Sequence, residues 1–321
     1  MMRKYKGCLL GLAVGDALGA AVEFMSIAEI KNKYGEEGIQ DFDSWNGFEA
    51  GSYTDDTQMA LATAVGCIKA AECWKKEGFF DPIPHLYNEY LSWLETQNDP
   101  FQQRAPGNTC LSALRSGRMG TMDAPINNSK GCGGVMRVAP VGLVFLGEMA
   151  FLEGVKTAAI THGHPSGYLS AGFLAGLVSH ILDGKILQEA IELSKETIKK
   201  FEGHQETLMS IDLAENLAKG DMPGVDAIQQ IGEGWTGEEA LAIAIYCSLK
   251  FSNNFRSAVT ASVNHSGDSD STGAIAGAIM GALLGDEAIP GSWVDRLENS
   301  QKIMEVAYEM YRFFKEQPSD F

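Results

Sequence analysis

The chain has 321 residues, 45% of them apolar, so it is long enough to bury a sizeable core. Lys and Arg number 25 against 42 Asp and Glu, and the formal charge of −17 argues against nucleic acid and anionic membranes as partners. Six cysteines occur without a CxxC pair or a histidine cluster, which indicates reduced thiols in a cytoplasmic protein rather than a disulfide framework or a zinc site.

The first predicted element is a helix close to the N-terminus. Arg3, Lys4 and Lys6 precede the short apolar run 8–14, an arrangement that resembles a secretion signal. Asp16 interrupts this run, and glycines continue through it at regular spacing, so an ordinary buried helix is favoured. The longest uncharged apolar stretch, 273–285, is shorter than the roughly 18 residues that a membrane span needs.

Two stretches of the chain carry glycine at every fourth residue. These glycines are Gly7, Gly11, Gly15 and Gly19 in the first stretch, and Gly273, Gly277, Gly281 and Gly285 in the second. Each glycine inside a helix costs about 1 kcal/mol relative to alanine, so eight of them need a compensating contact. Residues four apart share one helix face, where glycine lets two backbones approach closely. We therefore predict that both helices lie buried in the centre of the molecule.

The rest of the chain also reads as helical. Six of the ten prolines lie between Asp81 and Pro140, where we predict long loops over Asn98–Arg104 and Met119–Gly134. Apolar periodicity predicts amphipathic helices over Ile186–Phe201 and Ile303–Phe314. Alternating β-branched runs are nearly absent. We predict an all-α fold: a compact helical bundle with closely packed, glycine-striped central helices, forming a single domain over residues 1–321.

Two acidic clusters each come directly before an apolar helical run. They read Ser52-Tyr53-Thr54-Asp55-Asp56-Thr57-Gln58 and His265-Ser266-Gly267-Asp268-Ser269-Asp270-Ser271-Thr272. Helix capping explains one carboxylate at each helix start. Two carboxylates so close together repel each other unless a cation lies between them. Carboxylates and hydroxyls are also the ligands that Mg²⁺, Mn²⁺ and Ca²⁺ prefer. The residues alone leave capping and metal binding open, because the sequence does not show whether the clusters meet.

Five sequence blocks, in the same order along the chain, resemble those of the ADP-ribosylglycohydrolase family. Residues 7–24 read GCLLGLAVGDALGAAVEF, 51–64 GSYTDDTQMALATA, 131–143 GCGGVMRVAPVGL, 161–176 THGHPSGYLSAGFLAG and 264–281 NHSGDSDSTGAIAGAIMG. The family includes the dinitrogenase-reductase-activating glycohydrolases and the eukaryotic ADP-ribosyl-acceptor hydrolases. The resemblance implies an all-helical fold with two Mg²⁺ or Mn²⁺ ions at the base of a cleft.

Matched by position, the resemblance implies a set of metal ligands. These are Thr54, Asp55 and Asp56 from the first cluster, and Asp268, Asp270 and Ser271 from the second. Many relatives have Thr directly after the second Asp, whereas Ser271 stands there in this chain and Thr272 follows it, so either hydroxyl is a candidate.

Glu23 matches a glutamate that approaches the metals in the family. We expect it to act in catalysis together with Asp55 and Asp270, the alternative being an exposed carboxylate at a helix end. Asp16 is expected to support the ligands from behind, and a buried Asp with a capping partner is the alternative for it. The resemblance does not say which carboxylate is the general base.

The loop 130–136 holds three glycines, whose N–H groups can turn toward an anion. The matching loop binds the diphosphate of ADP-ribose in the family. The expected substrate contacts are Gly131, Gly133, Gly134, Val135 and Met136, together with His162 from the histidine block. A structural role is the alternative for His162. Arg137 is a candidate either for phosphate or for pairing with acidic groups in the core.

The expected function is metal-dependent removal of ADP-ribose from protein side chains, by attack of a metal-positioned water at C1″ of the ribose. ADP-ribosyl-arginine is the preferred substrate, and the alternatives are serine-linked ADP-ribose and a small molecule that contains ADP-ribose. For the function, the alternatives are a metal-dependent phosphohydrolase acting on small phosphoesters and a non-catalytic ADP-ribose-binding or structural member. We expect a cytoplasmic monomer with neither nucleic acid nor membrane as a partner.

Overall fold

Helices make up most of the chain in the computed structural model, which describes residues 1–78 and 80–316. The α-helices are α1 (Met2–Gly19), α2 (Ile27–Tyr34), α3 (Asp55–Glu77), α4 (Pro82–Thr96), α5 (Asn108–Arg115), α6 (Ala139–Val144), α7 (Gly147–Ala159), α8 (Pro165–Leu182), α9 (Leu187–Ile198), α10 (Gln205–Lys219), α11 (Gly224–Ile231), α12 (Gly237–Lys250), α13 (Phe255–Val263), α14 (Ser269–Leu284), α15 (Gly291–Arg296) and α16 (Ser300–Tyr311). Three short helical segments, η1 (Cys132–Gly134), η2 (Asp286–Ala288) and η3 (Arg312–Glu316), complete the set. Among the described residues the only β-pairing is in two isolated bridges, so the all-α prediction is confirmed.

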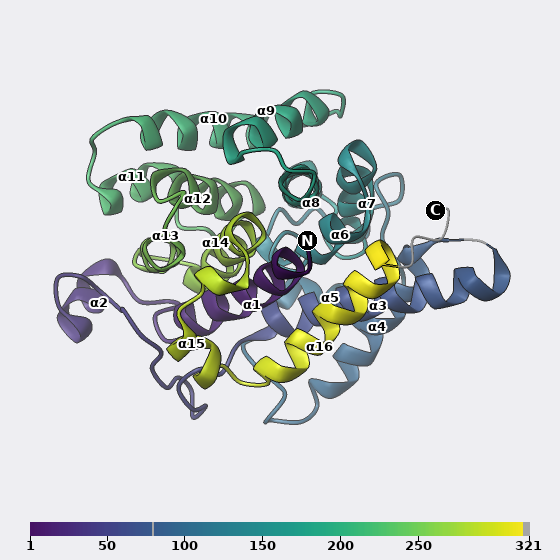
Figure 1. Cartoon of the computed structure of the whole chain (residues 1–321), viewed down its shortest axis with the longest axis horizontal. Coiled ribbons are helices and arrows are strands. Elements are labelled where there is room, and N and C mark those ends of the chain that lie inside the picture. The colour runs from purple at the N-terminus through teal and green to yellow at the C-terminus, as the bar shows by residue number, and fades with distance from the viewer. Residues whose placement is uncertain (79, 317–321) are drawn as a thin grey trace.

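The two glycine-striped helices, α1 and α14, lie side by side and antiparallel in the centre of the molecule (Figure 1). A Cβ atom added to Gly15 would lie 1.9 Å from the Gly273 carbonyl oxygen, and one added to Gly11 would lie 2.2 Å from that of Gly277. The helices therefore touch backbone to backbone. Such contact adds dispersion and Cα–H···O interactions that offset the cost of glycine in a helix. The predicted burial of both helices is confirmed.

The other helices are arranged around this central pair. Helices α12 and α13 pack against α14, and α16 packs against α1. Helix α7 packs on α8, and α4 packs on α3. Helices α9 and α10 form an outer layer at the top of Figure 1. Within residues 1–78 and 80–316, one hydrophobic cluster runs from Tyr5 to Phe314. This supports the single-domain interpretation, which stays a prediction.

The predicted amphipathic helices correspond to α9 and α16. The predicted loop Asn98–Arg104 has no regular helix, and the loop Met119–Gly134 ends in η1. The short helix α5 lies between these two loops. In the described part of the chain, no helix combines the length and the apolar character needed to cross a membrane. Four of the six cysteines, Cys8, Cys67, Cys110 and Cys247, are buried free thiols.

Candidate active site

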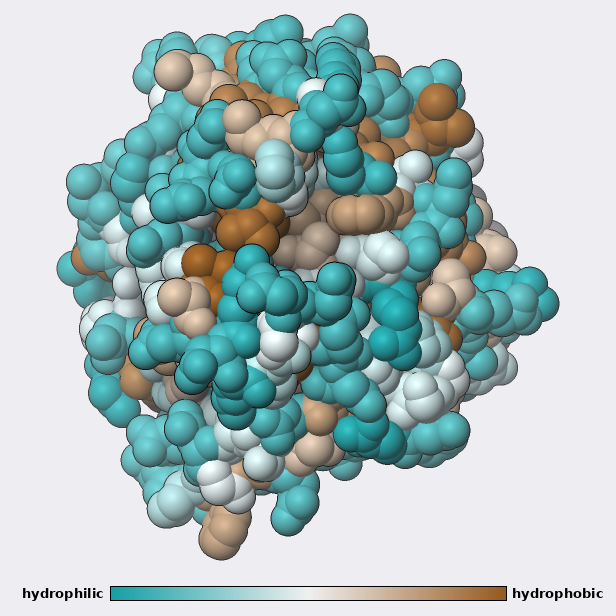
Figure 2. Space-filling model, turned by 90° about the vertical axis from the view of Figure 1, so that its left-hand side faces the viewer, coloured by the Kyte–Doolittle hydropathy of each residue, from teal (hydrophilic) through white to brown (hydrophobic). Residues whose placement is uncertain are grey.

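A cavity of about 350 Å³ lies where α1 ends and where α3 and α14 begin. Helix α1 runs from the middle of Figure 1 toward its left side, and Figure 2 views that side, where the surface is hollowed beside a group of apolar side chains. Both acidic clusters reach this cavity: Asp55 and Asp56 line it from α3, and Asp268 and Asp270 line it from α14. Residues about two hundred positions apart in the chain therefore line one cavity.

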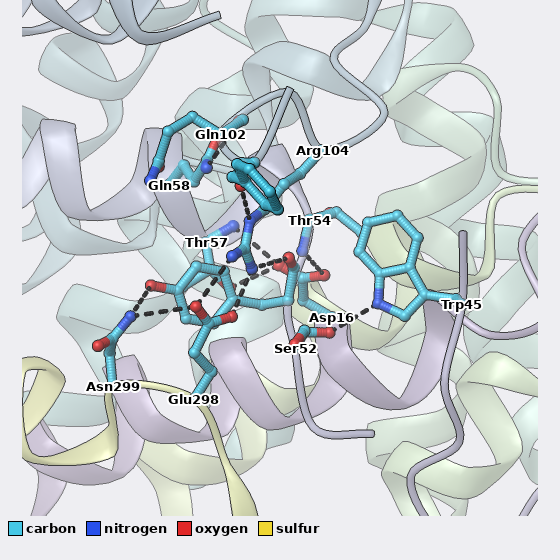
Figure 3. A network of polar contacts seen from close by, with 12 residues as sticks. Asp16, Trp45, Ser52, Thr54, Thr57, Gln58, Gln102, Arg104, Glu298 and Asn299 are labelled. Carbon is cyan, nitrogen blue, oxygen red and sulfur yellow. Dashed lines mark hydrogen bonds and ion pairs between the residues drawn. The ribbon is translucent and has the colours of Figure 1, made fainter. Parts of the chain in front are cut away.

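A buried carboxylate of α1 fixes the start of α3. Asp16 Oδ1 accepts the Thr54 N–H at 2.8 Å, and Asp16 Oδ2 accepts the Thr57 N–H at 2.9 Å and the Thr57 hydroxyl at 2.5 Å (Figure 3). Thr54 is the N-cap of α3, and its hydroxyl accepts the Asp56 N–H at 3.3 Å. These bonds set the direction of the first turn, from which Asp55 and Asp56 enter the cavity.

An ion pair holds the same turn from the other side. The Arg104 guanidinium donates to both carboxylate oxygens of Glu298 and, at 3.0 Å, to the Tyr53 carbonyl (Figure 3). The Arg104 carbonyl accepts the Asp55 N–H at 3.0 Å. The backbone on both sides of Thr54 is thus tied to one arginine.

The second cluster begins α14. Asp268 is its N-cap and accepts the Ser271 N–H at 3.3 Å, while Asp270 stands in the first turn. Ser271 lines the cavity. Thr272 faces the other way: its hydroxyl donates to the Ser262 carbonyl at 2.7 Å and lies 2.9 Å from His265 Nε2. Of the two candidate hydroxyls, Ser271 is the one at the cavity.

Glu23 lies in the turn after α1 and meets the second cluster. Carboxylate oxygens of Glu23, Asp268 and Asp270 all lie within 4.8 Å of one another. Burial, followed by the charges of Asp270 and Asp268, raises the pKa of Glu23 to about 11. Burial and then the charge of Asp270 raise the pKa of Asp16 to about 7. Without a cation, simultaneous ionisation of Glu23, Asp16 and the neighbouring aspartates is therefore unfavourable.

The donor set fits hard cations. Burial raises the pKa of Asp55, Asp56 and Asp270 well above the usual range, and the charge of a neighbouring aspartate adds to the rise at each of them. Asp56 Oδ2 is buried and has no hydrogen-bond partner among the described residues. A buried carboxylate oxygen without a donor is costly, and a divalent cation would remove both that cost and the repulsion. This acidic cluster could therefore bind metal.

The predicted substrate loop lies only partly at the cavity. Gly131, Gly133 and Met136 line it, whereas Gly134 and Val135 are buried behind its wall. The Cys132 and Met136 N–H groups already donate to backbone carbonyls, so the loop has fewer N–H groups available to an anion than its glycines suggest.

His162 also lines the cavity, and a chain of hydrogen bonds orients its ring. Arg137 donates to the Thr161 hydroxyl at 2.7 Å, and that hydroxyl lies 2.8 Å from His162 Nδ1. Because the Thr161 hydroxyl oxygen accepts from Arg137, we assign the Thr161 hydroxyl as the donor to His162 Nδ1. The neutral ring then carries its own proton on Nε2. Burial, then the charge of Arg137, lowers the pKa of His162 to about 3. The ring is therefore a neutral donor.

Arg137 itself is buried, and its partners differ from both roles considered for it. Its guanidinium donates to the Thr157 carbonyl at 3.3 Å and lies 4.2 Å from the centre of the Tyr90 ring. Neutral oxygens and an aromatic face, rather than core carboxylates, hold this charge. Its place behind Thr161 makes it a support for His162.

Several cavity residues were not predicted from the sequence. Phe24 and Trp235 stack with ring centres 5.2 Å apart, and both line the cavity. Residues 105–110, which lead into α5, form another wall. Cys132 completes the loop side. Phe24 adjoins Glu23 and Cys132 lies inside the glycine loop, so the sequence motifs could have pointed to both residues. Trp235 lies outside every sequence motif.

The chain resembles known proteins over nearly its whole length. Residues 1–319 match the ADP-ribosylglycohydrolase family. The chain is 32% identical over 296 residues to the ADP-ribosyl-(dinitrogen reductase) glycohydrolase of Rhodospirillum rubrum, covering 91% of this chain and 89% of that protein. It is 28% identical over 318 residues to the ADP-ribosylarginine hydrolase Tri1 of Pseudomonas putida (strain GB-1), covering 95% of this chain and 77% of that protein.

A solved structure described as an ADP-ribosylglycohydrolase-related protein complex matches with a TM-score of 0.67 and 26% identity, covering 97% of this chain and 98% of that one. The resemblance predicted from the five sequence blocks is confirmed. A family match over residues 1–319, together with a relative 32% identical across 91% of the chain, shows that this protein belongs to the ADP-ribosylglycohydrolase family.

Proposed function

We propose that this protein removes ADP-ribose from arginine side chains of modified proteins, by hydrolysis of the glycosidic bond at C1″ of the ribose with the help of two divalent cations. The observation that carries the proposal is the meeting of Glu23 with both acidic clusters in one cavity. Membership of the family sets the class of reaction.

Six residues would hold the cations. They are Thr54, Asp55 and Asp56 at the start of α3, and Asp268, Asp270 and Ser271 at the start of α14. Oxygen ligands of this kind suit Mg²⁺ or Mn²⁺. Bound ions would lower the pKa of a coordinated water and stabilise negative charge on the sugar oxygens.

Glu23 is the proposed proton acceptor. Its pKa is raised by burial and by the neighbouring aspartate charges, so neutralising those charges would leave the carboxylate able to take a proton from the attacking water. Asp55 and Asp270 would share in positioning that water. His162 would donate its Nε2 proton in a hydrogen bond to a ribose or diphosphate oxygen, beside Gly131, Gly133 and Met136.

The choice of arginine rests on two supports. The relatives from Rhodospirillum rubrum and Pseudomonas putida carry names that specify ADP-ribosylated dinitrogen reductase and ADP-ribosylarginine. In addition, a guanidinium group would meet both negative charge and aromatic faces at this cavity, because Phe24 and Trp235 stand beside Glu23. Buried free thiols such as those of Cys8 and Cys247 suit a cytoplasmic enzyme whose partner is an ADP-ribosylated protein.

The test is incubation of the purified protein with arginine-linked and serine-linked ADP-ribosyl peptides, with Mg²⁺ or Mn²⁺, while free ADP-ribose and inorganic phosphate are both measured. We expect intact ADP-ribose from the arginine peptide. Phosphate release would identify a phosphohydrolase instead, and metal binding without release of either product would identify a binding protein.

Asp270→Asn links the activity to this cavity. The substitution removes one negative charge but leaves Asp268 as the N-cap of α14, so the fold should persist while release falls about a hundredfold or more. Asp226→Asn is the matched control, since Asp226 is an exposed carboxylate in the first turn of α11. Near-normal release by Asp270→Asn, with an unchanged rise in Tm on adding Mg²⁺, would remove Asp270 from the site.

A further inference from the structure

A cysteine lies against the second acidic cluster. The Cys132 thiol donates to Asp268 Oδ2 at 2.7 Å, and its sulfur lies 3.6 Å from the Ser271 hydroxyl. The backbone there is held in place, because the Cys132 N–H donates to the Trp235 carbonyl at 3.2 Å. The sulfur is therefore fixed at the cavity wall next to two of the proposed cation ligands.

Two further observations point to a ligand at this place. Met136 Sδ lies 3.9 Å from the Ser271 hydroxyl, so a second sulfur flanks the same oxygen. Asp56, which is only 2% exposed, lines the same cavity, and within the described part of the chain its Oδ2 has no hydrogen-bond partner. An unpartnered carboxylate oxygen and two sulfur atoms thus share one cavity.

This mixture of donors has a chemical consequence. Carboxylates and hydroxyls suit Mg²⁺ and Mn²⁺, whereas thiolate and thioether sulfur favour softer ions. With bond lengths of about 2.3 Å to sulfur and 2.2 Å to oxygen, two ligands of one zinc ion lie at most about 4.5 Å apart. The separations of Cys132 Sγ from Asp268 and Ser271, 2.7 and 3.6 Å, are both inside this limit.

We propose that Cys132 Sγ is an additional ligand of the acidic centre and gives it affinity for thiophilic divalent cations such as Zn²⁺ and Cd²⁺. The sulfur would bind as thiolate, with its proton released to the buffer. The proposal rests on the proposed function for the existence of a cation centre, but it does not require that the centre hydrolyse ADP-ribose.

The test is a Cd²⁺ titration of the reduced protein, followed by ultraviolet absorption and calorimetry, with Cys132→Ser and Cys110→Ser. Cys110 lines the same cavity, but its sulfur lies 3.5 Å from Arg137 Nη1. We expect a thiolate-to-metal absorption band in the wild type and in Cys110→Ser. Cys132→Ser should lose the band and bind Cd²⁺ about tenfold or more weakly, while its Mg²⁺ affinity is retained.

Cys132→Ser distinguishes a Cys132 that binds the cation from a Cys132 that only orients Asp268, because a serine hydroxyl can still donate to the Asp268 carboxylate. A Cd²⁺ band that persists in Cys132→Ser, or no band in the wild type, would overturn the proposal. Equal losses of Mg²⁺ and Cd²⁺ affinity would also overturn it, since they would mean that the thiol only positions Asp268.

A measurement on the wild type alone covers the case in which Cys132→Ser does not fold. X-ray absorption of the zinc-loaded protein should show sulfur among the direct ligands, and a centre with only nitrogen and oxygen ligands would contradict the proposal. ADP-ribose release is followed in parallel with Mg²⁺. Sulfur ligation without release would refute the proposed function alone, and release without sulfur ligation would refute this inference alone.

Discussion

The Asp16 carboxylate accepts the Thr57 hydroxyl at 2.5 Å, so a buried side chain of α1 holds the first turn of α3. The same carboxylate accepts two backbone N–H groups, those of Thr54 and Thr57. Its role is to aim the neighbouring pair Asp55 and Asp56 at the cavity.

Asp16→Asn should weaken this support, because an amide N–H would face the donors of Thr57. With Mg²⁺ in excess, so that repulsion among the carboxylates is offset, we expect a loss of about 1–3 kcal/mol in the free energy of unfolding and weaker Mg²⁺ binding. Thr57→Val, which removes only the hydroxyl, should cost about 1 kcal/mol. Urea denaturation and calorimetric Mg²⁺ titration measure both effects, and unchanged values for Asp16→Asn would contradict the supporting role.

Gly15→Ala should disrupt the contact between α1 and α14. The new Cβ would lie 1.9 Å from the Gly273 carbonyl oxygen, a backbone atom that cannot rotate away, so the helices must separate. We expect a cost of about 3 kcal/mol or more in the free energy of unfolding.

Gly176→Ala is the matched control for this helix contact. Gly176 lies inside α8, and its added Cβ would meet Phe151 at an ordinary 3.6 Å, so alanine should be neutral or stabilise by up to about 1 kcal/mol. Equal effects of Gly15→Ala and Gly176→Ala in denaturant melts would show that the close approach is not a requirement of the fold.

His162→Ala should reduce turnover without removing a titration from the pH profile. Because burial and Arg137 lower the pKa of His162 to about 3, its ring stays neutral at working pH and contributes a hydrogen bond rather than a proton. We expect a loss of about tenfold in kcat/KM, corresponding to one hydrogen bond of roughly 1.4 kcal/mol. The check is kcat/KM against pH for both proteins, and an ionisation near neutral pH that disappears in His162→Ala would be the contrary result.

Without divalent cations, the protein should lose stability as pH rises from about 6.5 to about 8. The pKa values of Asp16 and Glu23, about 7 and about 11, exceed their ordinary values of 3.8 and 4.5, so the folded state binds more protons than the unfolded state in this range. Stability then falls with rising pH. The lowered pKa of His162 acts in the opposite direction and makes the folded state more stable as pH rises. That gain in stability is nearly complete above pH 6.5, the ordinary value of its pKa.

Mg²⁺ should reverse this trend, because cations replace the protons that the carboxylates would otherwise keep. Thermal melting at the two pH values, in EDTA and in Mg²⁺, measures the effect, and Asp270→Asn should flatten the slope seen in EDTA. A Tm in EDTA that rises with pH over this range would contradict the mutual repulsion of the carboxylates.

The central helix pair could be predicted because its signal is local. Gly11 and Gly277 each lie in an unbroken i+4 series of glycines, and the absence of a side chain on that helix face is what allows the two backbones to approach closely. The acidic clusters were found for a similar reason, since neighbouring carboxylates such as Asp55 and Asp56 have a recognisable chemistry. What the sequence could not show is their meeting, which depends on how α1 joins α3 to α14.

Other features of the site depend on contacts between distant residues. Cys132 and Asp268 are 136 positions apart, and Arg104 and Glu298 are 194 apart, so no local pattern links the members of either pair. The choice between Ser271 and Thr272 depends on the rotation of α14, because successive residues of a helix point in different directions. Only packing around that helix decides which hydroxyl reaches the cavity.

The pairing of α1 with α14 also sets a time order for synthesis on the ribosome. Gly7 rests against Gly281, so the glycine face of α1 has no partner until most of the polypeptide has been translated. Contacts between such remote segments are slow to form. The carboxylates of Glu23 and Asp270 come together only with that late docking, so the proposed cation site cannot form on a nascent chain before α14 emerges.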